Sequence, residues 1–480
     1  MATQTSTRRG GIRVLVSKAC ATAGLAALYS ALLSGCAHAP FDDSPPGVPG
    51  HFETVTTTAA PKISHWWTRF GSRELDNFMA EANAGNYDIA VAYARLKQSE
   101  ATADVTEAAL YPTLNFSSDS QRSQGSGTSV PHQVVHPNAR NSYNALFNVS
   151  YVADVWGQNR NLLEAALHNQ DASAYQVEVT RLTARAAVVN DFLIYAADYE
   201  RVQISKENLT NAKRILAVIK DRAATGTASK LDVSQQDNLV ATQEAAIPVL
   251  RALAETSRTA LALVMGRAPQ GFHPVTKSTR GLKLPAVSPG LPSSLLVRRP
   301  DIRQAEEQMA ADEANVEAAR KAFLPTFTLN GDVGRQSALI SAFYLPQSVV
   351  WSIAASAAQP IFDGGKLRAQ LRLSEAQREE LLNTYRKSVI QALVDVENAL
   401  INIRENDLRE RALRRAVTSA KEAFDLSEQR LHEGTIDITT LLNVQNTLFT
   451  AQDSLVQARL ARLQALVALF QALGGDWDNR

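Results

Sequence analysis

The spacing of apolar residues changes along the first part of the chain. Over residues 74–110 the apolar positions recur on one helix face, with a break near residues 85–86. Residues 113–122 and 142–153 then alternate apolar and small polar side chains, which is the period of a strand with one apolar face. The pattern predicts a helix followed by two strands joined by a polar loop.

A very long helix is predicted after these strands. Residues 160–224 contain neither proline nor glycine, and Val188, Phe192 and Tyr195 fall at heptad spacing, as in a coiled coil. At 1.5 Å per residue, a continuous helix over this range is roughly 100 Å long. Such a helix needs partners along its length, so we expect it to pack in a larger helical assembly.

A Gly-Thr turn follows the long helix, and a second Gly-Thr turn occurs in the second half of the chain. Gly226-Thr227 recurs as Gly434-Thr435, at an offset of 208 residues. Glycine tolerates the left-handed conformation that ends many helices, and an N-cap residue type follows in both copies. Each copy therefore predicts the tip of a helical hairpin, at about residues 225–229 and 433–437.

The whole pattern repeats, so the chain is predicted to be mainly α with a small β part, in two repeats of helix–strand–strand–long helix–helix. In the second repeat the strands are expected at about residues 326–336 and 349–359. The expected divisions are a signal peptide at 1–35, a lipid-anchored extended tether at 36–64, a first repeat at 65–266, a connector rich in proline and glycine at 267–294, a second repeat at 295–474 and a tail at 475–480.

The first residues have the pattern of an export signal. A cationic start precedes an apolar run at residues 19–33, which is short for a membrane span, and the run ends in Leu33-Ser34-Gly35-Cys36. That tetrad resembles the lipoprotein box of bacteria, so we expect Cys36 to carry a diacylglycerol and an N-acyl chain such as palmitate, with no other cofactor. Ala37 is not the acidic residue of an inner-membrane retention signal, which favours the outer membrane. The alternative is an ordinary secretory signal that is cleaved near Ala37-His38-Ala39.

The strand pattern alone leaves two locations open for the strands. They form either a soluble hairpin with one buried face or a hairpin that crosses a membrane. Four strands cannot close a barrel, and lipid does not tolerate open sheet edges, so membrane strands must be pooled from several chains. Three chains would supply twelve strands and twelve helical passes. We expect a homotrimer in which a 12-stranded transmembrane β-barrel continues into a 12-helix periplasmic α-barrel.

Several stretches of the sequence carry a resemblance to a known family. They are Leu-Leu-Val-Arg-Arg-Pro-Asp-Ile-Arg at 295–303, Phe-Leu-Pro-Thr-Phe at 323–327 and Gln-Pro-Ile-Phe-Asp-Gly-Gly at 359–365. With Trp66-Trp67 and the lipid box, they make residues 65–474 resemble the TolC/OprM outer membrane factors, and the NodT-type efflux lipoproteins among them.

The resemblance implies a trimeric tunnel that spans the outer membrane lipid and has a long periplasmic extension. Such a tunnel docks by its helical tips on a periplasmic adaptor protein, which couples it to a proton-driven inner-membrane pump. The implied function is the exit duct of a tripartite system for small molecules such as drugs, as in multidrug resistance. Two alternatives remain open: an outer membrane duct of an ATP-driven protein secretion system, and a structural envelope lipoprotein without a pore.

The resemblance also assigns roles to residues at the hairpin tips. Gly226, Thr227, Gly434 and Thr435 match the turns that dock on the adaptor, and Asp232 matches an aspartate of the periplasmic gate. The other interpretation of the two glycines is that they are simple helix stops, and Asp232 is otherwise a helix-start acid that the helix dipole stabilises.

The second tip departs from the family pattern. Asp437 is expected to supply negative charge to the gate, but from a different position relative to the tip glycine than in the family. Lys230 is expected to pair with Asp232 at the first tip. The family's linking arginine, its tyrosine and its two aspartates are replaced here by Ile436, Leu431, Thr440 and Asn443. A carboxylate gate is therefore expected without the latch that the family uses.

The composition excludes several other classes of function. The net charge at pH 7 is only +1, so nothing points to a nucleic-acid partner. We find no catalytic or phosphate-binding motif and do not expect an enzyme. His132 and His136 lie in a polar loop beside prolines, and we expect no metal site there or elsewhere.

Overall fold

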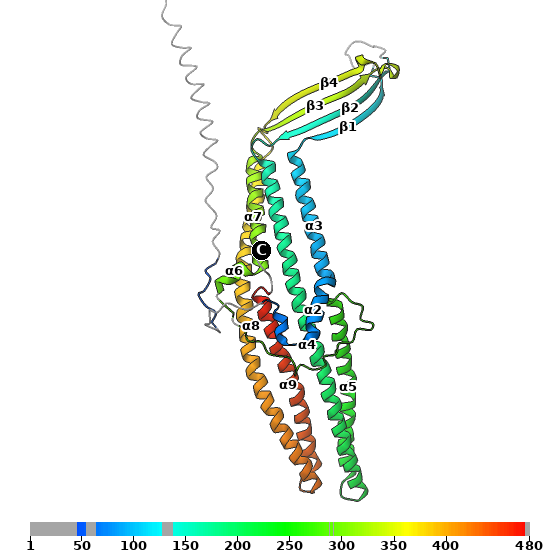
Figure 1. The fold of residues 1–480 in the computed structure, drawn as a ribbon, viewed down its shortest axis with the longest axis vertical. Helices are drawn as coiled ribbons and strands as arrows, with labels where there is room; N and C mark the ends of the chain where they lie inside the picture. The colour runs from blue at the N-terminus through cyan, green and yellow to red at the C-terminus, as the bar shows by residue number, and fades with distance from the viewer. Residues whose placement is uncertain (1–45, 54–63, 127–137, 288, 291, 476–480) are drawn as a thin grey trace, which may run out of the picture. The chain divides into compact units, whose positions relative to one another are not determined.

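The computed structural model describes residues 46–53, 64–126, 138–287, 289–290 and 292–475 (Figure 1). This part of the chain is mainly helical with a small antiparallel sheet, which confirms the predicted fold class. Its helices and strands are α2 (Arg73–Gly85), α3 (Tyr87–Glu107), β1 (Thr113–Ser123), β2 (Arg140–Ala153), α4 (Gln158–Ala224), α5 (Lys230–Val264), α6 (Leu295–Arg298), α7 (Pro300–Lys321), β3 (Thr326–Ser337), β4 (Val349–Ala358), α8 (Lys366–His432) and α9 (Ile438–Ala472), with a short 3-10 helix η1 (Trp66–Phe70) before α2.

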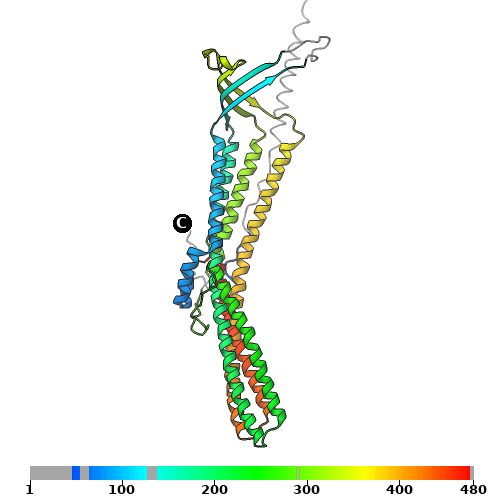
Figure 2. The ribbon, with the colours of Figure 1, turned by 90° about the vertical axis from the view of Figure 1, so that its right-hand side faces the viewer.

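The two repeats match closely in the lengths of their helices. The long helices α4 and α8 each span 67 residues, and the return helices α5 and α9 each span 35. The two hairpins, α4–α5 and α8–α9, run side by side and end in neighbouring tips (Figures 1 and 2). All four strands begin and end within two residues of the positions expected from the alternation of side chains.

The sheet takes two strands from each repeat, in the order β1-β2-β3-β4. All neighbours are antiparallel, and the pairing of β2 with β3 joins the repeats. Residues that pair directly across strands share one face of a sheet. The register therefore places one row of apolar side chains on the same face, and all four are exposed: Phe116, Phe147, Val333 and Trp351.

The helices are held together by apolar cores at several levels. Midway along the long helices, the fully buried Trp66 stacks on Phe470 of α9 with 5.0 Å between ring centroids, and Phe192 of α4 lies in the same cluster. Near the tips, Ile219 of α4 packs in one cluster with Leu441 of α9. Burial along the whole length is the reason that helices this long are stable in one chain.

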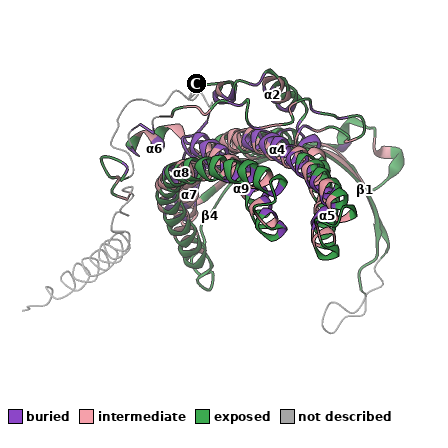
Figure 3. Cartoon of the chain, turned by 90° about the horizontal axis from the view of Figure 1, so that it is seen from below, coloured by how far each residue is buried: buried purple, intermediate pink, exposed green. Residues whose placement is uncertain are grey.

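Seen from below, α5, α4, α9 and α8 lie in a curved row, with buried residues where neighbouring helices touch (Figure 3). Between residues 46 and 475, in the parts that the structure describes, no helix is long and apolar enough to cross a membrane.

Candidate functional site

The two hairpin tips close in the same way. At the first tip, Gly226 adopts φ +78°, and the Thr227 amide donates a hydrogen bond back to the Arg222 carbonyl at 2.8 Å. At the second tip, Gly434 adopts φ +75°, and the Thr435 amide donates to the Arg430 carbonyl at 3.0 Å. These bonds satisfy the last carbonyls of α4 and α8, as expected of glycine-terminated helices. All four turn residues are exposed, so both tips present the same Gly-Thr surface.

The two acids predicted for the gate both bind the start of their own helix. The Asp232 carboxylate accepts the Ser229 amide at 2.7 Å, while the Ser229 hydroxyl accepts the Asp232 amide at 3.2 Å, which makes a capping box. Asp437 accepts the Thr440 amide at 2.8 Å, and this hydrogen bond lowers the pKa of its carboxyl. In the single chain, each carboxylate thus accepts a backbone amide at the start of its helix and caps that helix.

The salt bridge expected between Lys230 and Asp232 does not form. No ion pair joins the two side chains among the described residues of the first tip, where the Asp232 carboxylate accepts the Ser229 amide instead. The exposed Lys230 ammonium therefore contributes positive charge at the tip and does not form an ion pair with Asp232.

Arginines of α4 connect the first hairpin to the second, which the sequence did not predict. Arg201 Nε lies 2.6 Å from Asp453 Oδ1 of α9, and Arg214 Nη2 donates to Glu428 Oε2 of α8 at 2.9 Å. Arg222, one turn before the tip, donates to the Leu431 carbonyl at the end of α8. These contacts form a row of links between the hairpins that ends at the tips.

The second face of the sheet is polar and internally hydrogen-bonded. Ser150 of β2 donates to Asn330 of β3 at 2.9 Å, and Ser352 of β4 donates to Asp332 of β3 at 2.8 Å. These residues alternate along the strands with the exposed apolar rows. A sheet with one apolar and one polar face suits a wall between lipid and water.

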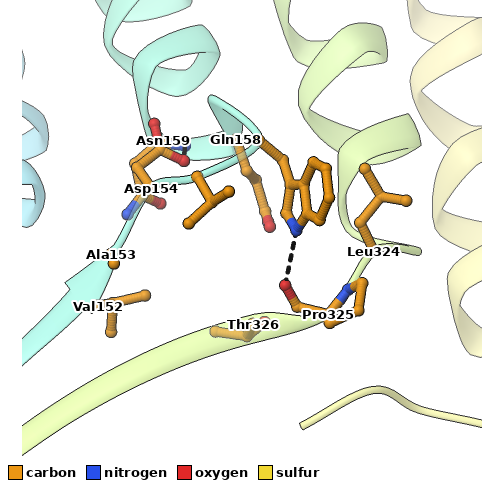
Figure 4. A pocket seen from close by; sticks show the side chains of 10 residues that line it. Val152, Ala153, Asp154, Gln158, Asn159, Leu324, Pro325 and Thr326 are labelled. Carbon is orange, nitrogen blue, oxygen red and sulfur yellow. Dashed lines mark hydrogen bonds between the residues drawn. The ribbon is translucent and has the colours of Figure 1, made fainter. Parts of the chain in front are cut away.

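A tight corner joins the strands to the long helices. Asp154 accepts the amides of Asn159 and Arg160 at the start of α4, at 3.1 and 3.0 Å. Trp156 Nε1 donates to the Pro325 carbonyl at 2.8 Å and ties this corner to the start of β3 (Figure 4). The hollow at this corner measures about 30 Å³, which is room for about one or two water molecules and not for a substrate.

Some predicted residues lie outside the described part of the chain, namely Cys36, His132 and His136. Among the described residues, one group has the geometry to hold a metal ion: His168 and Asp171 of α4 with Glu307 of α7. Nothing in the local sequence indicated this group, because its third member lies 136 residues after Asp171.

Comparison with known proteins gives consistent matches over both repeats. A family model described as outer membrane efflux protein matches residues 79–267 and 291–475. The pyoverdine export outer membrane protein OpmQ of Pseudomonas aeruginosa is 35% identical over 454 residues, which cover 93% of this chain and 95% of that protein. Nodulation protein T of Rhizobium leguminosarum bv. trifolii is 27% identical, covering 88% of this chain and 90% of that protein. The solved structure of the outer-membrane channel OprN is similar with a TM-score of 0.81 and 26% identity, covering 92% of this chain and 99% of that one.

Proposed function

The chain belongs to the outer membrane efflux protein family, and on this premise we propose that three copies of it form one exit duct for small molecules. The protein is an outer membrane efflux channel. Because family members are channels, we infer that the chain does no covalent chemistry and that a partner pump supplies the energy for transport.

The observation that carries the proposal is the four-stranded sheet with two open edges and an exposed apolar face. Large apolar side chains such as Phe116 and Trp351, 62% and 73% exposed in the single chain, are stable against lipid and unfavourable against water. The free edges of β1 and β4 need partners in a membrane, because unpaired backbone groups cost several kcal/mol each in lipid. Pairing β1 of one copy with β4 of the next satisfies both edges.

The polar face of the sheet would then line a water-filled lumen. Its serine, asparagine and aspartate side chains bond to one another, as Ser352 does to Asp332. A duct of this kind selects little by itself. We infer that substrate choice lies with the pump and its adaptor.

The hairpin tips are the surface on which we place the adaptor. Gly226-Thr227 and Gly434-Thr435 present two nearly identical turns per chain, so three chains would offer six similar docking points to adaptor subunits. The pump coupled through this adaptor is proposed to be proton-driven. OpmQ, which is named for the export of pyoverdine, supports a small-molecule substrate.

A gate at the periplasmic end is also proposed for the tips. Asp232, Asp437 and Lys230 lie at the starts of the return helices, and a threefold ring of such charges would create a strong local potential. The links from Arg201, Arg214 and Arg222 of α4 to the second hairpin take the place of the family's latch.

We propose that Cys36 anchors the chain through a diacylglycerol and an N-acyl chain. One acyl group gives only marginal membrane binding, whereas several chains hold firmly. The anchor would keep the assembling chains at the outer membrane.

The test of the proposed function is crosslinking in living cells from a cysteine at the tip. The variant Thr435→Cys places a thiol on the docking surface, and Thr256→Cys, exposed on α5 far from the tips, is the matched control. Partners captured by a short thiol–amine crosslinker are identified by mass spectrometry.

Capture of the adaptor of a proton-driven pump from Thr435→Cys, and not from Thr256→Cys, is the expected result. Capture of an adaptor of an ATP-driven secretion system would move the substrate to proteins. Intact trimers that capture no adaptor would contradict the tripartite assignment and favour a structural envelope lipoprotein.

A further inference from the structure

The group formed by His168, Asp171 and Glu307 lies between the first and second repeats, outside the tips and the sheet. His168 and Asp171 are three residues apart on α4, so they lie on the same side of that helix. Glu307 projects from α7, which packs along α4 (Figure 1). The ligand-type atoms of the three side chains all lie within 4.8 Å of one another.

A simple ion pair does not account for this arrangement. His168 Nδ1 lies 2.7 Å from Glu307 Oε2, which already satisfies one carboxylate with one imidazole. Asp171 adds a second carboxylate, and its side chain forms no hydrogen bond or ion pair with any residue that the structure describes.

One cation lies near the group, namely Arg303, one turn before Glu307 on α7. Its charge acts on Glu307, while its guanidinium Nη1 bonds to Glu306 at 2.7 Å. Glu307 also pairs with His168, whereas Asp171 forms no ion pair with any residue that the structure describes. A bound divalent cation would balance the negative charge of Asp171.

The backbone around the site is held by close helix packing. Ala165, one turn before His168, is buried against Ala311 and Ala314 of α7. Small side chains let the two helices approach closely, so the ligands from α4 and α7 stand at a fixed separation. Ligands of one zinc ion, each about 2 Å from the metal, lie about 3–4 Å apart in a tetrahedral site. The three ligand atoms lie within 4.8 Å of one another, and the Asp171 side chain is exposed, so it is not locked in place by packing.

We propose that His168, Asp171 and Glu307 form a binding site for a divalent transition-metal ion of the zinc class, which joins the first repeat to the second. One imidazole nitrogen and two carboxylate oxygens are a normal ligand set for zinc, and water fills the fourth position. The site lies within one chain, so a trimer holds three. It goes beyond the export function and replaces the expectation, drawn from the sequence, that the chain has no metal site.

The test is zinc binding by the full-length protein, purified in detergent without a histidine tag and stripped with a chelator. Isothermal titration with ZnCl₂ at pH 7.5 gives stoichiometry and affinity, and CoCl₂ gives a visible absorption band that reports the coordination. The variants are His168→Gln, Asp171→Asn and Glu307→Gln. The matched controls are Glu164→Gln, an exposed acid one turn earlier on α4, and His432→Gln, an exposed histidine at the second tip.

The expected result is one zinc per chain, an affinity that falls about tenfold or more in each ligand variant, and unchanged binding in both controls. Zinc should also raise the melting temperature of the wild-type protein but not that of Asp171→Asn. Asp171 is exposed, so its replacement by asparagine leaves the fold intact. Equal zinc binding by wild type and Asp171→Asn, or no binding at millimolar zinc, would overturn the proposal.

Discussion

The buried carboxylate of Glu200 helps to fix the connector between the repeats. Glu200 of α4 is 5% exposed, and its oxygens accept hydrogen bonds from the Ser278 hydroxyl, the Thr279 amide and hydroxyl, and Arg280 Nε. From the other side, Arg459 of α9 donates to carbonyl oxygens of the same connector segment. Charged residues of both repeats therefore hold the segment between them.

Replacing Glu200 by glutamine should loosen the connector. The change removes the charge from a buried acceptor of four hydrogen bonds, and we expect a local loss of about 2–3 kcal/mol. Hydrogen exchange at residues 278–280, which bond to Glu200, should then speed up by roughly 30- to 150-fold, since 1.4 kcal/mol corresponds to a factor of about ten. Mass spectrometry of the deuterated protein measures this directly.

Glu244→Gln is the control for that experiment. Glu244 pairs with Lys213 at 2.5 Å, but both side chains are about half exposed, so the pair contributes about 0–1 kcal/mol. The account of the connector is wrong if Glu200→Gln and Glu244→Gln change its exchange equally little.

The roles of several single residues could be predicted from the residues next to them in the sequence, but one such prediction was wrong. The Gly-Thr turns were readable because only glycine adopts positive φ at low cost. The Lys230–Asp232 pair was wrong, although Ser229 three residues before Asp232 is itself the signature of a capping box. Arg222 was missed for a different reason, because its acceptor, the Leu431 carbonyl, lies in the other repeat.

At the scale of elements, the close pairing of β2 with β3 depends on one glycine. A Cβ at Gly334 would stand 2.1 Å from the Ala145 carbonyl oxygen, which the backbone cannot accommodate. A Cβ at Gly331, three residues earlier in the same strand, would stand 3.7 Å from its nearest neighbour, the Ser352 carbonyl oxygen. The two glycines thus form a matched pair for testing the sheet.

We expect Gly334→Ala to prevent assembly and Gly331→Ala to permit it. The first forces β2 and β3 apart and breaks their register, whereas the second adds a methyl group in ordinary contact distance. Heat-modifiable oligomers on detergent gels report the outcome. Oligomers of normal yield and heat stability from Gly334→Ala would show that this strand pair is not part of the assembled sheet.

The links between the hairpins set how easily the tips separate. Arg201–Asp453 and Arg214–Glu428 are partly exposed pairs of about 0.5–1 kcal/mol each, so removing both should favour separated hairpins by roughly 5- to 30-fold. The variant carries Arg201→Gln and Arg214→Gln. Spin labels on cysteines at Thr227 and Thr435, in labelled chains diluted with unlabelled ones, give the distance between the two tips.

We expect a single narrow distance in the parent protein and a broad distribution in the double variant. A variant that combines Arg214→Glu with Glu428→Arg reverses the charges of this pair and so keeps the ion pair. Compared with Arg214→Glu alone, it should recover most of the narrow distance component. An unchanged distribution in the double variant would mean that apolar packing, and not the arginine links, holds the tips together.

At the scale of the whole molecule, periodicity predicted the elements but not the contacts between repeats. The proline-free run that became α4, and the alternation at β1 to β4, follow from local physics and appear where expected. The cluster of His168, Asp171 and Glu307 and the buried Glu200 network join residues more than 70 positions apart. No local pattern marks such contacts, because they exist only once α4 has packed on its neighbours.

The central claim is that the open sheet of one chain is completed by its copies. One face of the sheet is apolar and exposed, the other is polar, and both edge strands lack partners within the described chain. Three chains with β1 of each paired to β4 of the next would leave no free edge in the membrane.

Crosslinking between edge strands tests this claim most directly. Asn115→Cys in β1 and Ala354→Cys in β4 both lie on the polar face. A bis-maleimide with a reach of about 10 Å joins neighbouring strands but not β1 and β4 of one chain, which stand about 14 Å apart at 4.8 Å per strand. The account predicts a ladder of one, two and three chains that stops at three, and no ladder from either single-cysteine variant. Monomers only, or a ladder that continues beyond three, would contradict it.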